Sequence, residues 1–485
     1  DDDDTGDDDT VGDDDTVGDD DTSGDDDTSG DDDTSGDDDT TVDGPQGVID
    51  LSTADAKLIG ENAYDQVGIA VAGAGDVNAD GFDDLLMGAP WEDTGGSDAG
   101  AAYLMLGPVS GLIDLSAADA KLTGEADSDL TGYTVAGAGD VNNDGFDDLL
   151  IGSPYDDTNW PNSGAAYLVH GPVVGTSSLA AADAKLVGVA QCGLAIAGAG
   201  DVNGDGHDDL LVATPEDGTQ DSDAGATYLV HGPVNGLFDL SGANTMFVGE
   251  DGGDQSGVSV AGVGDVDGDS LDDFLIGAKN ADNNGAAYLV TSAFMGMVNL
   301  YYADAKLTGE QGADQAGWAV AGAGDVDGDG HADLLVGAHA APGNTAVGRV
   351  YLVLGPVGGT VPLAQADAVF LGEAPLDWAG HSLDGAGDVN GDGLDDLFIA
   401  APYNDEADSQ AGAQYLVYGT PSGTIDLANA DAKFLGEMID DEAGMSVAGA
   451  GDVDGDGYDD LLVGSGYQDA GMTMSGAVYL ILGGP

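Results

Sequence analysis

The stretch GIAVAGAGDVNADGFDDLLMGAP, at residues 68–90, decides the fold because it returns along the rest of the chain. A near copy, GYTVAGAGDVNNDGFDDLLIGSP, occupies residues 132–154. The aspartate that opens the central motif recurs every 60 to 64 residues, at Asp76, Asp140, Asp201, Asp265, Asp325, Asp388 and Asp452. Seven copies at a nearly constant period indicate a repeat architecture.

Each copy contains four short apolar segments separated by Gly, Asp, Asn and Pro. In the first copy they are AKLIGE at 56–61, GIAVAG at 68–73, DLLMGAP at 84–90 and AAYLMLG at 101–107. Segments of this length between turn residues are typical of β-strands, and no helical apolar period of sufficient length is present. Four strands per repeat describe a propeller blade. The predicted fold is therefore all-β, a seven-bladed β-propeller over residues 48–485 behind an Asp/Thr-rich low-complexity tail at 1–47.

The composition of the segments predicts their places in a blade. Segments such as 70–75 and 319–324 are almost wholly Ala, Gly and Val, as expected for an innermost strand crowded around an axis. A tyrosine lies instead in the third strand of every blade, counted from the axis, which is the segment 101–107 in the first copy. It is predicted to fill the space between neighbouring sheets. These tyrosines are Tyr103, Tyr167, Tyr228, Tyr288, Tyr351, Tyr415 and Tyr479. The array begins with the strand at 56–61 and ends with a third strand at 477–482. Pairing these two would close the ring and remove two sheet edges.

The charge of the chain excludes several partners. Its 485 residues include 94 Asp and Glu but 7 Lys and Arg, a formal net charge of −87. Such a chain repels nucleic acid and anionic membranes, so cationic partners are expected. The single Cys192 excludes an intramolecular disulfide. Because no run of 18 apolar residues occurs and no signal segment opens the chain, we expect no membrane span and the mature form of an extracellular or cell-surface protein.

A loop of the form D-x-[DN]-x-D-[GS]-x-x-D joins the first, innermost strand of every blade to the second, as between the segments 68–73 and 84–90. Calcium prefers six to eight oxygen ligands, which alternate side chains of a tight loop bring to one point. Without a cation, three or four carboxylates within nine residues repel one another. About seven Ca²⁺ sites are therefore predicted. Their side-chain ligands would be Asp76, Asn78, Asp80 and Asp84; Asp140, Asn142, Asp144 and Asp148; Asp201, Asn203, Asp205 and Asp209; Asp265, Asp267, Asp269 and Asp273; Asp325, Asp327, Asp329 and Asp333; Asp388, Asn390, Asp392 and Asp396; Asp452, Asp454, Asp456 and Asp460.

The seventh position of each loop is expected to add a backbone carbonyl ligand. These residues are Phe82, Phe146, His207, Leu271, His331, Leu394 and Tyr458. The closing carboxylate comes at position 9 instead of 12 and strands flank the loop, so it is not an EF-hand. The fourth loop is expected to bind least well, because Ser270 replaces the glycine that allows the sharp bend.

The blocks at 68–90 and 132–154 resemble FG-GAP repeats, the units of integrin α-chain propellers and of many bacterial surface proteins, and the resemblance covers residues 48–485. The Phe of the FG pair is replaced in every copy, by Val67, Thr131, Cys192, Ser256, Ala316, Ala379 and Ala443, and GAP survives whole only at 88–90. The resemblance implies calcium loops on the lower face and a protein or glycan partner on the opposite face, formed by the loops between strands 4 and 1 and between strands 2 and 3. It implies an adhesion, recognition or structural module.

The candidate contact loops of that opposite face are acidic and variable, at 91–98, 155–163, 215–223, 403–410 and 467–475. Trp91, Trp160 and Trp378 either stack on sugar rings or anchor a protein partner, or else pack away from solvent. No catalytic residue is predicted, because the chain has no G-x-S-x-G elbow and no phosphate-cradling loop. The alternative is a polysaccharide-acting enzyme on the propeller scaffold, since a glycosidase pair could lie among so many carboxylates.

Residues 1–42 are seven near-identical six-residue units of the DDDTSG kind, followed by DGPQG at 43–47. With almost no apolar side chain, this tail is predicted to have no core of its own. It is either an acidic linker, or a stalk with O-glycans on its threonines, or a segment that docks on the next molecule and builds a filament by self-association. The candidate O-glycosylation sites are Thr5, Thr10, Thr16, Thr22, Thr28, Thr34 and Thr40.

Overall fold

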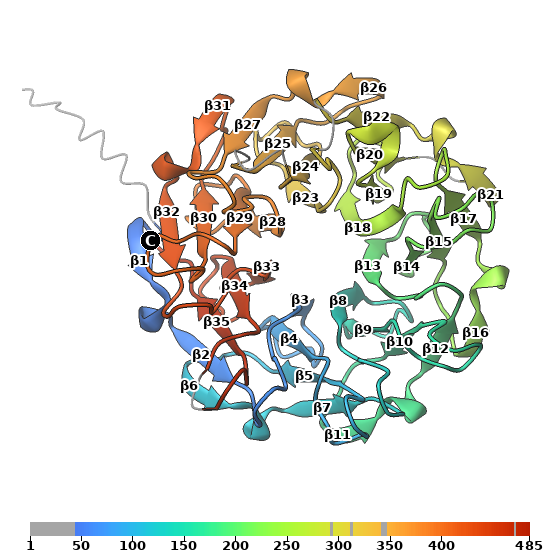
Figure 1. The fold of residues 1–485 in the computed structure, drawn as a ribbon, viewed down its shortest axis with the longest axis horizontal. Coiled ribbons are helices and arrows are strands. Elements are labelled where there is room, and N and C mark those ends of the chain that lie inside the picture. Colours follow the sequence, from blue (N-terminus) through green and yellow to red (C-terminus); the bar gives the residue numbers. More distant parts are fainter. Residues whose placement is uncertain (1–43, 292–293, 311–313, 341–346, 470–471) are drawn as a thin grey trace, which may run out of the picture. The chain divides into compact units, whose positions relative to one another are not determined.

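The computed structural model describes residues 44–291, 294–310, 314–340, 347–469 and 472–485. The predictions for the tail threonines lie outside the described residues. The described residues from 44 onward belong to one compact unit, in which seven five-stranded sheets surround a central channel (Figure 1). This confirms the predicted seven-bladed β-propeller.

In every blade the strands are hydrogen-bonded in order from the channel outwards. Blade 1 consists of β3 (Val71–Gly75), β4 (Asp84–Ala89), β5 (Ala101–Met105), β7 (Ala120–Thr123) and β11 (Gly175–Ser178). Blade 2 consists of β8 (Thr134–Gly139), β9 (Asp148–Ser153), β10 (Ala165–Val169), β12 (Ala184–Val187) and β16 (Gly236–Asp239). Blade 3 consists of β13 (Ala195–Gly200), β14 (Asp209–Thr214), β15 (Ala226–Val230), β17 (Thr245–Val248) and β21 (Gly296–Asn299).

The remaining blades repeat this order. Blade 4 consists of β18 (Ser256–Gly264), β19 (Asp273–Ala278), β20 (Ala286–Val290), β22 (Ala305–Thr308) and β26 (Gly359–Pro362). Blade 5 consists of β23 (Val320–Gly324), β24 (Asp333–Ala338), β25 (Arg349–Val353), β27 (Ala368–Leu371) and β31 (Gly423–Asp426). Blade 6 consists of β28 (Leu383–Gly387), β29 (Asp396–Ala401), β30 (Ala413–Val417), β32 (Ala432–Leu435) and β1 (Gly47–Asp50). Blade 7 consists of β33 (Ser446–Gly451), β34 (Asp460–Ser465), β35 (Ala477–Ile481), β2 (Ala56–Ile59) and β6 (Gly111–Asp114).

The fifth strand of each blade is an element that the sequence pattern of four strands missed. After β5 the chain crosses to the preceding blade, where β6 pairs in parallel with β2. A three-residue 3₁₀ turn, η2 (Leu115–Ala117), then leads back to β7, and Asp114 caps this turn by accepting a hydrogen bond from the Ser116 N–H. Residues 111–114 are largely exposed, so they lack the apolar alternation by which a strand is recognised.

The same kind of 3₁₀ turn follows every fifth strand and begins with a buried leucine. The other members are η1 (Leu51–Thr53), η3 (Leu179–Ala181), η4 (Leu240–Gly242), η6 (Leu300–Tyr302), η7 (Leu363–Gln365) and η8 (Leu427–Asn429). A further 3₁₀ turn, η5 (Ala281–Asn283), lies between β19 and β20. These turns hold the outer strands against the sheets through the buried leucine.

Two N-terminal strands close the ring. β2 pairs antiparallel with β35, with Ala56 opposite Leu480, as predicted for the strand at 56–61. β1 also pairs in parallel with β32 of blade 6, with Gly47 opposite Ala432. Figure 1 shows the blue N-terminal strands beside the orange and red C-terminal ones. The first residues of the ring therefore complete two blades instead of the one that we predicted.

The inner strands are confirmed as the crowded part of each blade. A Cβ atom on Gly73 would lie 2.8 Å from the carbonyl oxygen of Gly449 in the neighbouring blade, closer than Cβ contacts normally come. The inner strands enclose a space of about 310 Å³. Asp384 of β28 is a charged residue in the wall of this space. The equivalent positions of β3 and β33 hold small apolar residues, Ala72 and Ala448.

The third-strand tyrosines are buried between blades, as predicted, and five of them carry a lysine over the ring. In blade 1, Lys121 Nζ lies 5.1 Å from the centroid of Tyr103. It also lies 2.9 Å from Glu92 of the same blade and 3.1 Å from Glu61, which follows β2 of blade 7. The lysine therefore links two blades by an ion pair while its ammonium group covers the aromatic ring.

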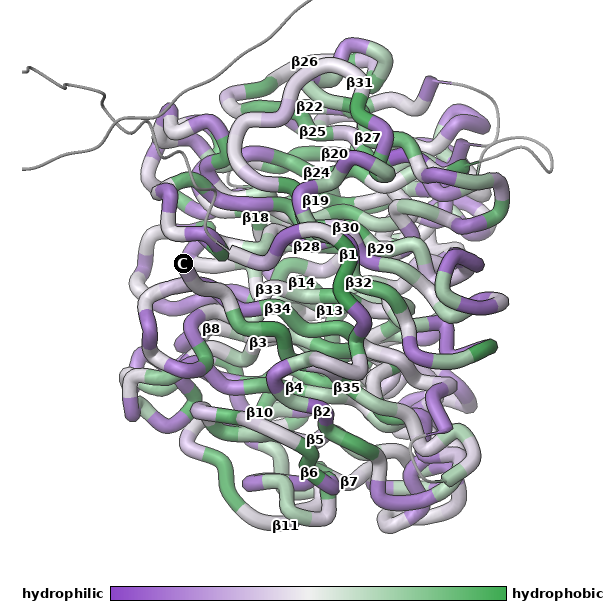
Figure 2. Tube along the Cα trace, turned by 90° about the vertical axis from the view of Figure 1, so that its left-hand side faces the viewer, coloured by the Kyte–Doolittle hydropathy of each residue, from purple (hydrophilic) through white to green (hydrophobic). Residues whose placement is uncertain are grey.

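The surface of the described residues is polar at the loops. Figure 2 colours the strands mainly green or pale and the connecting loops more often purple. This agrees with apolar residues in the sheets and Asp, Asn and Ser in the turns.

No helix in the described ranges is long and apolar enough to cross a membrane.

Candidate metal-binding loops

All seven predicted metal loops lie at the same end of their blades, between the first strand and the second. In blade 1 the loop leaves β3 at Gly75, whose φ of 70° is in the left-handed region, and re-enters the sheet at Asp84 of β4. Only glycine adopts this conformation without a steric cost. The sequence order of strand, glycine and acidic loop thus places seven similar loops around one face.

The first aspartate of each loop is oriented by the backbone of its own loop. Asp76 accepts hydrogen bonds from the N–H groups of Asp80, at 3.0 Å, and of Gly81, at 2.9 Å. The same pair of bonds recurs in the other six loops. A carboxylate has about four lone-pair sites, so these bonds hold the group in place and still leave acceptor capacity for a cation.

The closing aspartate of each loop is buried at the start of the second strand. Asp84 has no exposed surface, and its two oxygens accept hydrogen bonds from the N–H groups of Val77, at 3.0 Å, and Gly107, at 2.9 Å. Burial, together with the smaller effect of the charges of Asp76 and Asp80, raises the pKa of Asp84 to about 7. All seven closing aspartates have pKa values raised to about 6 or 7, with burial as the main cause. A nearby cation would favour the charged form.

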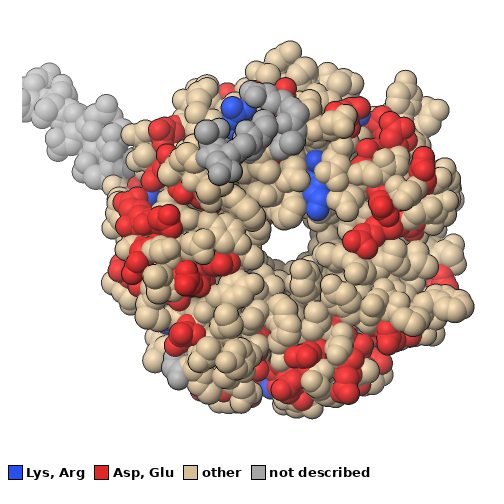
Figure 3. Space-filling model, viewed as in Figure 1, with Lys and Arg blue, Asp and Glu red and all other residues tan. Residues whose placement is uncertain are grey.

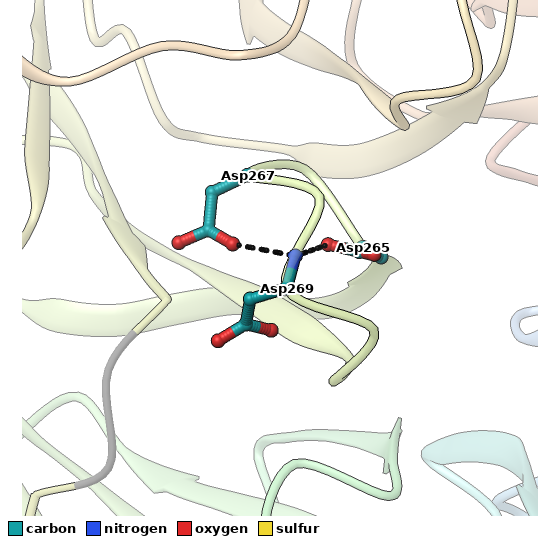
Figure 4. A group of neighbouring side chains, drawn as sticks. All are labelled: Asp265, Asp267 and Asp269. Atoms are coloured by element: carbon teal, nitrogen blue, oxygen red, sulfur yellow. Dashed lines mark hydrogen bonds between the residues drawn. The ribbon is translucent and has the colours of Figure 1, made fainter.

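Three loops bring three carboxylates within 4.8 Å of one another. Figure 4 shows one of these groups, Asp265, Asp267 and Asp269, around the N–H of Asp269, which lies 3.0 Å from Asp265 Oδ1 and 3.1 Å from Asp267 Oδ1. The other groups are Asp325, Asp327 and Asp333, and Asp452, Asp454 and Asp460. All three loops have Asp at the third position, where the remaining four have Asn. Such a group of hard oxygen donors could hold a divalent cation.

In two of the four asparagine loops the amide donates to a carboxylate of the same loop. Asn203 Nδ2 donates to Asp209 Oδ2 at 3.0 Å, and Asn390 Nδ2 donates to Asp392 Oδ2 at 3.4 Å. A cation would require the amide oxygen instead, which rotation about the terminal side-chain bond presents at the same place.

The residues predicted to supply carbonyl ligands lie at the turn into the second strand. Each donates its N–H to the carboxylate at position 5, as Phe82 does to Asp80 at 3.2 Å. The other six behave alike. Their role as carbonyl ligands stays a prediction.

Ser270 adopts the backbone conformation of the glycine that it replaces. Its φ is 72°, close to the 90° of Gly81, although a non-glycine residue pays a steric cost there. The carboxylates of this loop nevertheless come together (Figure 4). The expected weakness of the fourth loop therefore rests on backbone strain and not on a lack of ligands.

The eighth loop position has a function that the sequence did not reveal. The Asp147 carboxylate of blade 2 accepts a hydrogen bond from the N–H of Asp76 at 2.8 Å. Burial raises the pKa of Asp147. In this structure the Asp147 carboxylate therefore forms a contact between adjacent metal loops. That it is not a ligand of its own loop stays a prediction.

The predicted contact loops lie at the opposite end of the blades, because they follow the second strand. Trp160 is the most exposed of the predicted tryptophans, with 72% of its surface accessible. Trp378 instead packs against His339 and Tyr403, with ring centroids 5.0 and 4.6 Å away. Burial lowers the pKa of His339 to about 3, so this histidine is neutral near pH 7. Figure 3 shows one face of the molecule, with red acidic patches mainly on its outer part, mostly tan residues at the rim of the central opening and few blue residues.

Comparison with known proteins finds a family similar to the segments that contain six of the seven loops, all except the fourth loop at 265–273. The FG-GAP repeat family matches residues 67–105, 131–169, 193–230, 316–353, 379–423 and 443–481. Integrin alpha pat-2 of Caenorhabditis elegans is 30% identical over 249 residues, which are 48% of this chain and 19% of that protein. Integrin alpha-V of Gallus gallus is 31% identical over 222 residues, which are 43% of this chain and 20% of that protein. The chain thus spans about a fifth of the length of these relatives.

Solved structures that match most of the chain do so at low sequence identity. The structure of BBS1N in complex with ARL6DN has a TM-score of 0.45 and 11% sequence identity, and the match covers 90% of this chain and 96% of that one. The V. cholerae biofilm matrix protein Bap1 has a TM-score of 0.26 and 13% identity, with 91% of this chain and 71% of that one covered.

Proposed function

We propose, on the premise that this chain is an integrin-alpha-like FG-GAP repeat β-propeller, that it is an extracellular or cell-surface adhesion or recognition module which binds calcium in its seven loops. The observation that carries this proposal is the repeated geometry of the loops. Each combines an oriented first aspartate with a buried closing aspartate. This arrangement supports cation binding seven times on one face.

Within each loop, the side chains at positions 1, 3, 5 and 9 and the carbonyl at position 7 are the proposed ligands. In the seventh loop these are Asp452, Asp454, Asp456, Asp460 and the carbonyl of Tyr458. Calcium fits better than zinc, because all the donors are oxygens and the loops contain no cysteine. When bound, the ion would compensate the charge of the buried closing carboxylate, which lowers the free energy of the folded state relative to the unfolded chain.

The opposite face is the proposed site of a protein or glycan partner. Its loops differ from blade to blade, while the metal loops repeat, and they carry the exposed Trp160. Loops that vary on a rigid scaffold are where binding residues concentrate. We propose that this face binds its partner without catalysis. The alternative of a polysaccharide-cleaving enzyme would require a catalytic pair of carboxylates, and we assign none in these loops.

This function is tested with the calcium-loaded propeller immobilised on a sensor surface. Cell-surface material from the source organism should bind in calcium and dissociate in EGTA. Replacing the 155–163 loop by a Gly/Ser segment of equal length should reduce the binding, whereas an alanine at the exposed Asp80 on the metal face should reduce it much less. Binding that neither EGTA nor replacement of the 155–163 loop reduces would overturn the proposal.

The tail is proposed to act as a spacer or stalk, and its six-residue period supports regular modification of Thr10, Thr16 and the equivalent threonines. Intact-mass measurement of native protein tests this. Masses above the polypeptide value in hexose or hexosamine steps would support O-glycans, and the polypeptide mass alone would leave a plain acidic spacer.

A further inference from the structure

The gap between blades 2 and 3 differs from the others around the ring. In β17, Met246 lies opposite Tyr228, in the place that lysine takes opposite the tyrosines of blades 1, 2, 4, 6 and 7. Blade 5 has Val369 there, but Arg349 supplies a cation and pairs with Glu310 at 3.2 Å. Blade 3 alone combines this tyrosine with no cation among the described residues.

The glutamate that would pair with this lysine from the neighbouring blade is also missing at this gap. In the AKLxGE segments the final glutamate reaches the lysine of the next blade, as Glu125 does for Lys185 at 3.3 Å. The segment that should serve blade 3 ends in Val189. Both members of the inter-blade ion pair are thus replaced by apolar residues at the same gap.

One carboxylate of the original arrangement remains. Asp217 is 2% exposed and occupies the place of Asp156 in blade 2. Asp156 accepts from Lys185 Nζ at 2.7 Å and from the Tyr167 hydroxyl at 3.0 Å. Asp217 accepts from the Thr219 N–H and from the Tyr228 hydroxyl at 3.4 Å. Among the described residues no lysine or arginine pairs with it, so a buried carboxylate lacks the cation that its counterpart has.

A pocket of about 540 Å³ lies at the two residues that donate hydrogen bonds to this carboxylate; Asp217 lies behind them, and Asp239 is the carboxylate in the lining itself. The pocket is lined by Tyr228 and Thr219, the two hydrogen-bond partners of Asp217, and by Met246, Val189 and Trp160. The volume is within the range of about 300 to 1,000 Å³ that is typical of ligand sites. Trp160 is 72% and Val189 is 42% exposed, so apolar side chains of the pocket are open to solvent. The polar residues Asn159, Asp239 and Ser241 lie in the same lining.

We propose that this pocket binds a lysine side chain of a partner protein, which takes the place of the missing lysine of blade 3. Its ammonium group would lie beside Asp217 and over the ring of Tyr228. In the complete gaps the ammonium group lies 4.9 to 5.3 Å from the ring centroid. Its aliphatic chain would pack on Met246 and Val189, and the residue next to it on Trp160.

Charge selects this occupant over an apolar side chain or a sugar. Burying a carboxylate without a cation is unfavourable, and a cation from the partner removes that cost. The chain as a whole carries a net charge of −87, which attracts cationic partners in solution. A neutral sugar could stack on Trp160 but would leave Asp217 without its cation. The inference rests on the proposed function, because it names the chemistry of a partner on the face proposed for recognition.

The test uses the full calcium-loaded chain and a pair of peptides, acetyl-Gly-Lys-Gly-amide and the same peptide with an acetylated lysine. Isothermal titration calorimetry near physiological salt should give binding of the first peptide that is about ten-fold or more tighter than that of the second. Acetylation keeps the chain and removes the charge.

Two matched pairs of variants separate this pocket from general attraction to an acidic surface. Met246→Lys fills the pocket with an internal lysine and should abolish peptide binding, whereas Met246→Leu keeps the apolar wall and should not. Asp217→Asn should weaken binding about ten-fold or more, whereas Asp221→Asn removes the same formal charge from an exposed residue and should leave binding unchanged. Melting curves in calcium establish that each variant is folded.

Equal affinity for the two peptides would overturn the proposal, and so would unchanged binding to the Met246→Lys variant. A methyl glycoside that binds where the lysine peptide does not would overturn it as well and assign the pocket to a sugar. If the chain retains its calcium-dependent partner while no lysine peptide binds, this site is wrong and the proposed function stands.

Discussion

The backbone N–H of Asp452 donates a hydrogen bond to the carboxylate of Asp83 at 2.9 Å, which joins the metal loop of blade 7 to blade 1. The same link connects five further pairs of neighbouring loops. Only between blades 4 and 5 does Ala332 take the place of the aspartate. The loops are therefore positioned by their neighbours, so closing the ring and ordering the metal loops are physically connected.

Replacing Asp83 by alanine should destabilise the propeller without removing a bound ion. The substitution leaves the N–H of Asp452 without its charged acceptor, a loss of about 1 to 3 kcal/mol. Thermal unfolding in calcium measures the first effect and elemental analysis of the bound metal the second. The matched variant Ala332→Asp supplies the missing acceptor at the one gap without it and should raise the melting temperature. Loss of an ion from the Asp83→Ala variant would make this residue a ligand.

Truncation from the N-terminus should show two steps. Removing residues 1–43 should leave the melting temperature nearly unchanged, because it keeps every strand of the seven blades, the first of which begins at Gly47. Removing residues 1–54 deletes β1 and should lower it. Removing residues 1–62 also deletes β2, opens the ring at β35 and should abolish cooperative unfolding. Circular dichroism follows all three, and equal stability of the last two would refute closure by β2.

Alanine at position 5 of a loop should remove one ion at a time. Asp80→Ala and Asp456→Ala each delete a proposed ligand that also accepts the N–H of the residue two positions later. Each variant should bind one calcium ion fewer than the wild-type protein by mass spectrometry of the intact native complex. The double variant should bind two fewer, because the loops lie in separate blades. An undiminished count in either single variant would show that its loop does not hold calcium.

Asp384 should make stability depend on pH. Burial in the channel wall raises its pKa to about 7 from 3.8. Since the folded state prefers the protonated carboxyl group, its contribution to stability is complete below about pH 4 and is lost as the pH rises through about 7. Asp384→Asn should therefore match the wild-type protein near pH 4 and exceed it above pH 7, by on the order of 2 kcal/mol.

Unfolding by denaturant in excess calcium, compared for the two proteins at each pH, measures this difference. The comparison cancels the titration of the other carboxylates, which both proteins share. A stability difference that stays constant from pH 4 to 8 would mean that Asp384 does not titrate in the folded protein within this range.

Much of the architecture could be predicted because it repeats. The spacing of the aspartates predicts the number of blades, and the strand at 56–61 predicts the closure that Ala56 and Leu480 make. The fifth strands were not predicted, because strands such as Gly111–Asp114 are only four residues long and largely exposed. Their pairing depends on the outer edge of the preceding blade, which the local sequence does not contain.

The sequence alone predicts each metal loop of the candidate site, but not the contacts between neighbouring loops. The order of Asp, Asn and Gly predicts the turn, and the structure brings Asp265, Asp267 and Asp269 together. The contact between Asp83 and Asp452 joins residues at the two ends of the ring, so no local pattern reveals it. The sequence repeats show Met246 and Val189 where other copies have lysine and glutamate. That this exchange removes an ion pair between blades is evident only from the structure, in which the other gaps have such an ion pair.

Thermal unfolding with and without EGTA tests the central claim most directly. One site at a hundredfold excess of calcium over its Kd contributes about 2.7 kcal/mol, so seven sites predict a far larger fall in melting temperature than any single variant here. Sodium chloride added to the calcium-free protein should restore little of it, because screening does not replace ligands of a bound ion. A melting curve that EGTA leaves unchanged, or that salt restores fully, would contradict the account of a calcium-loaded propeller.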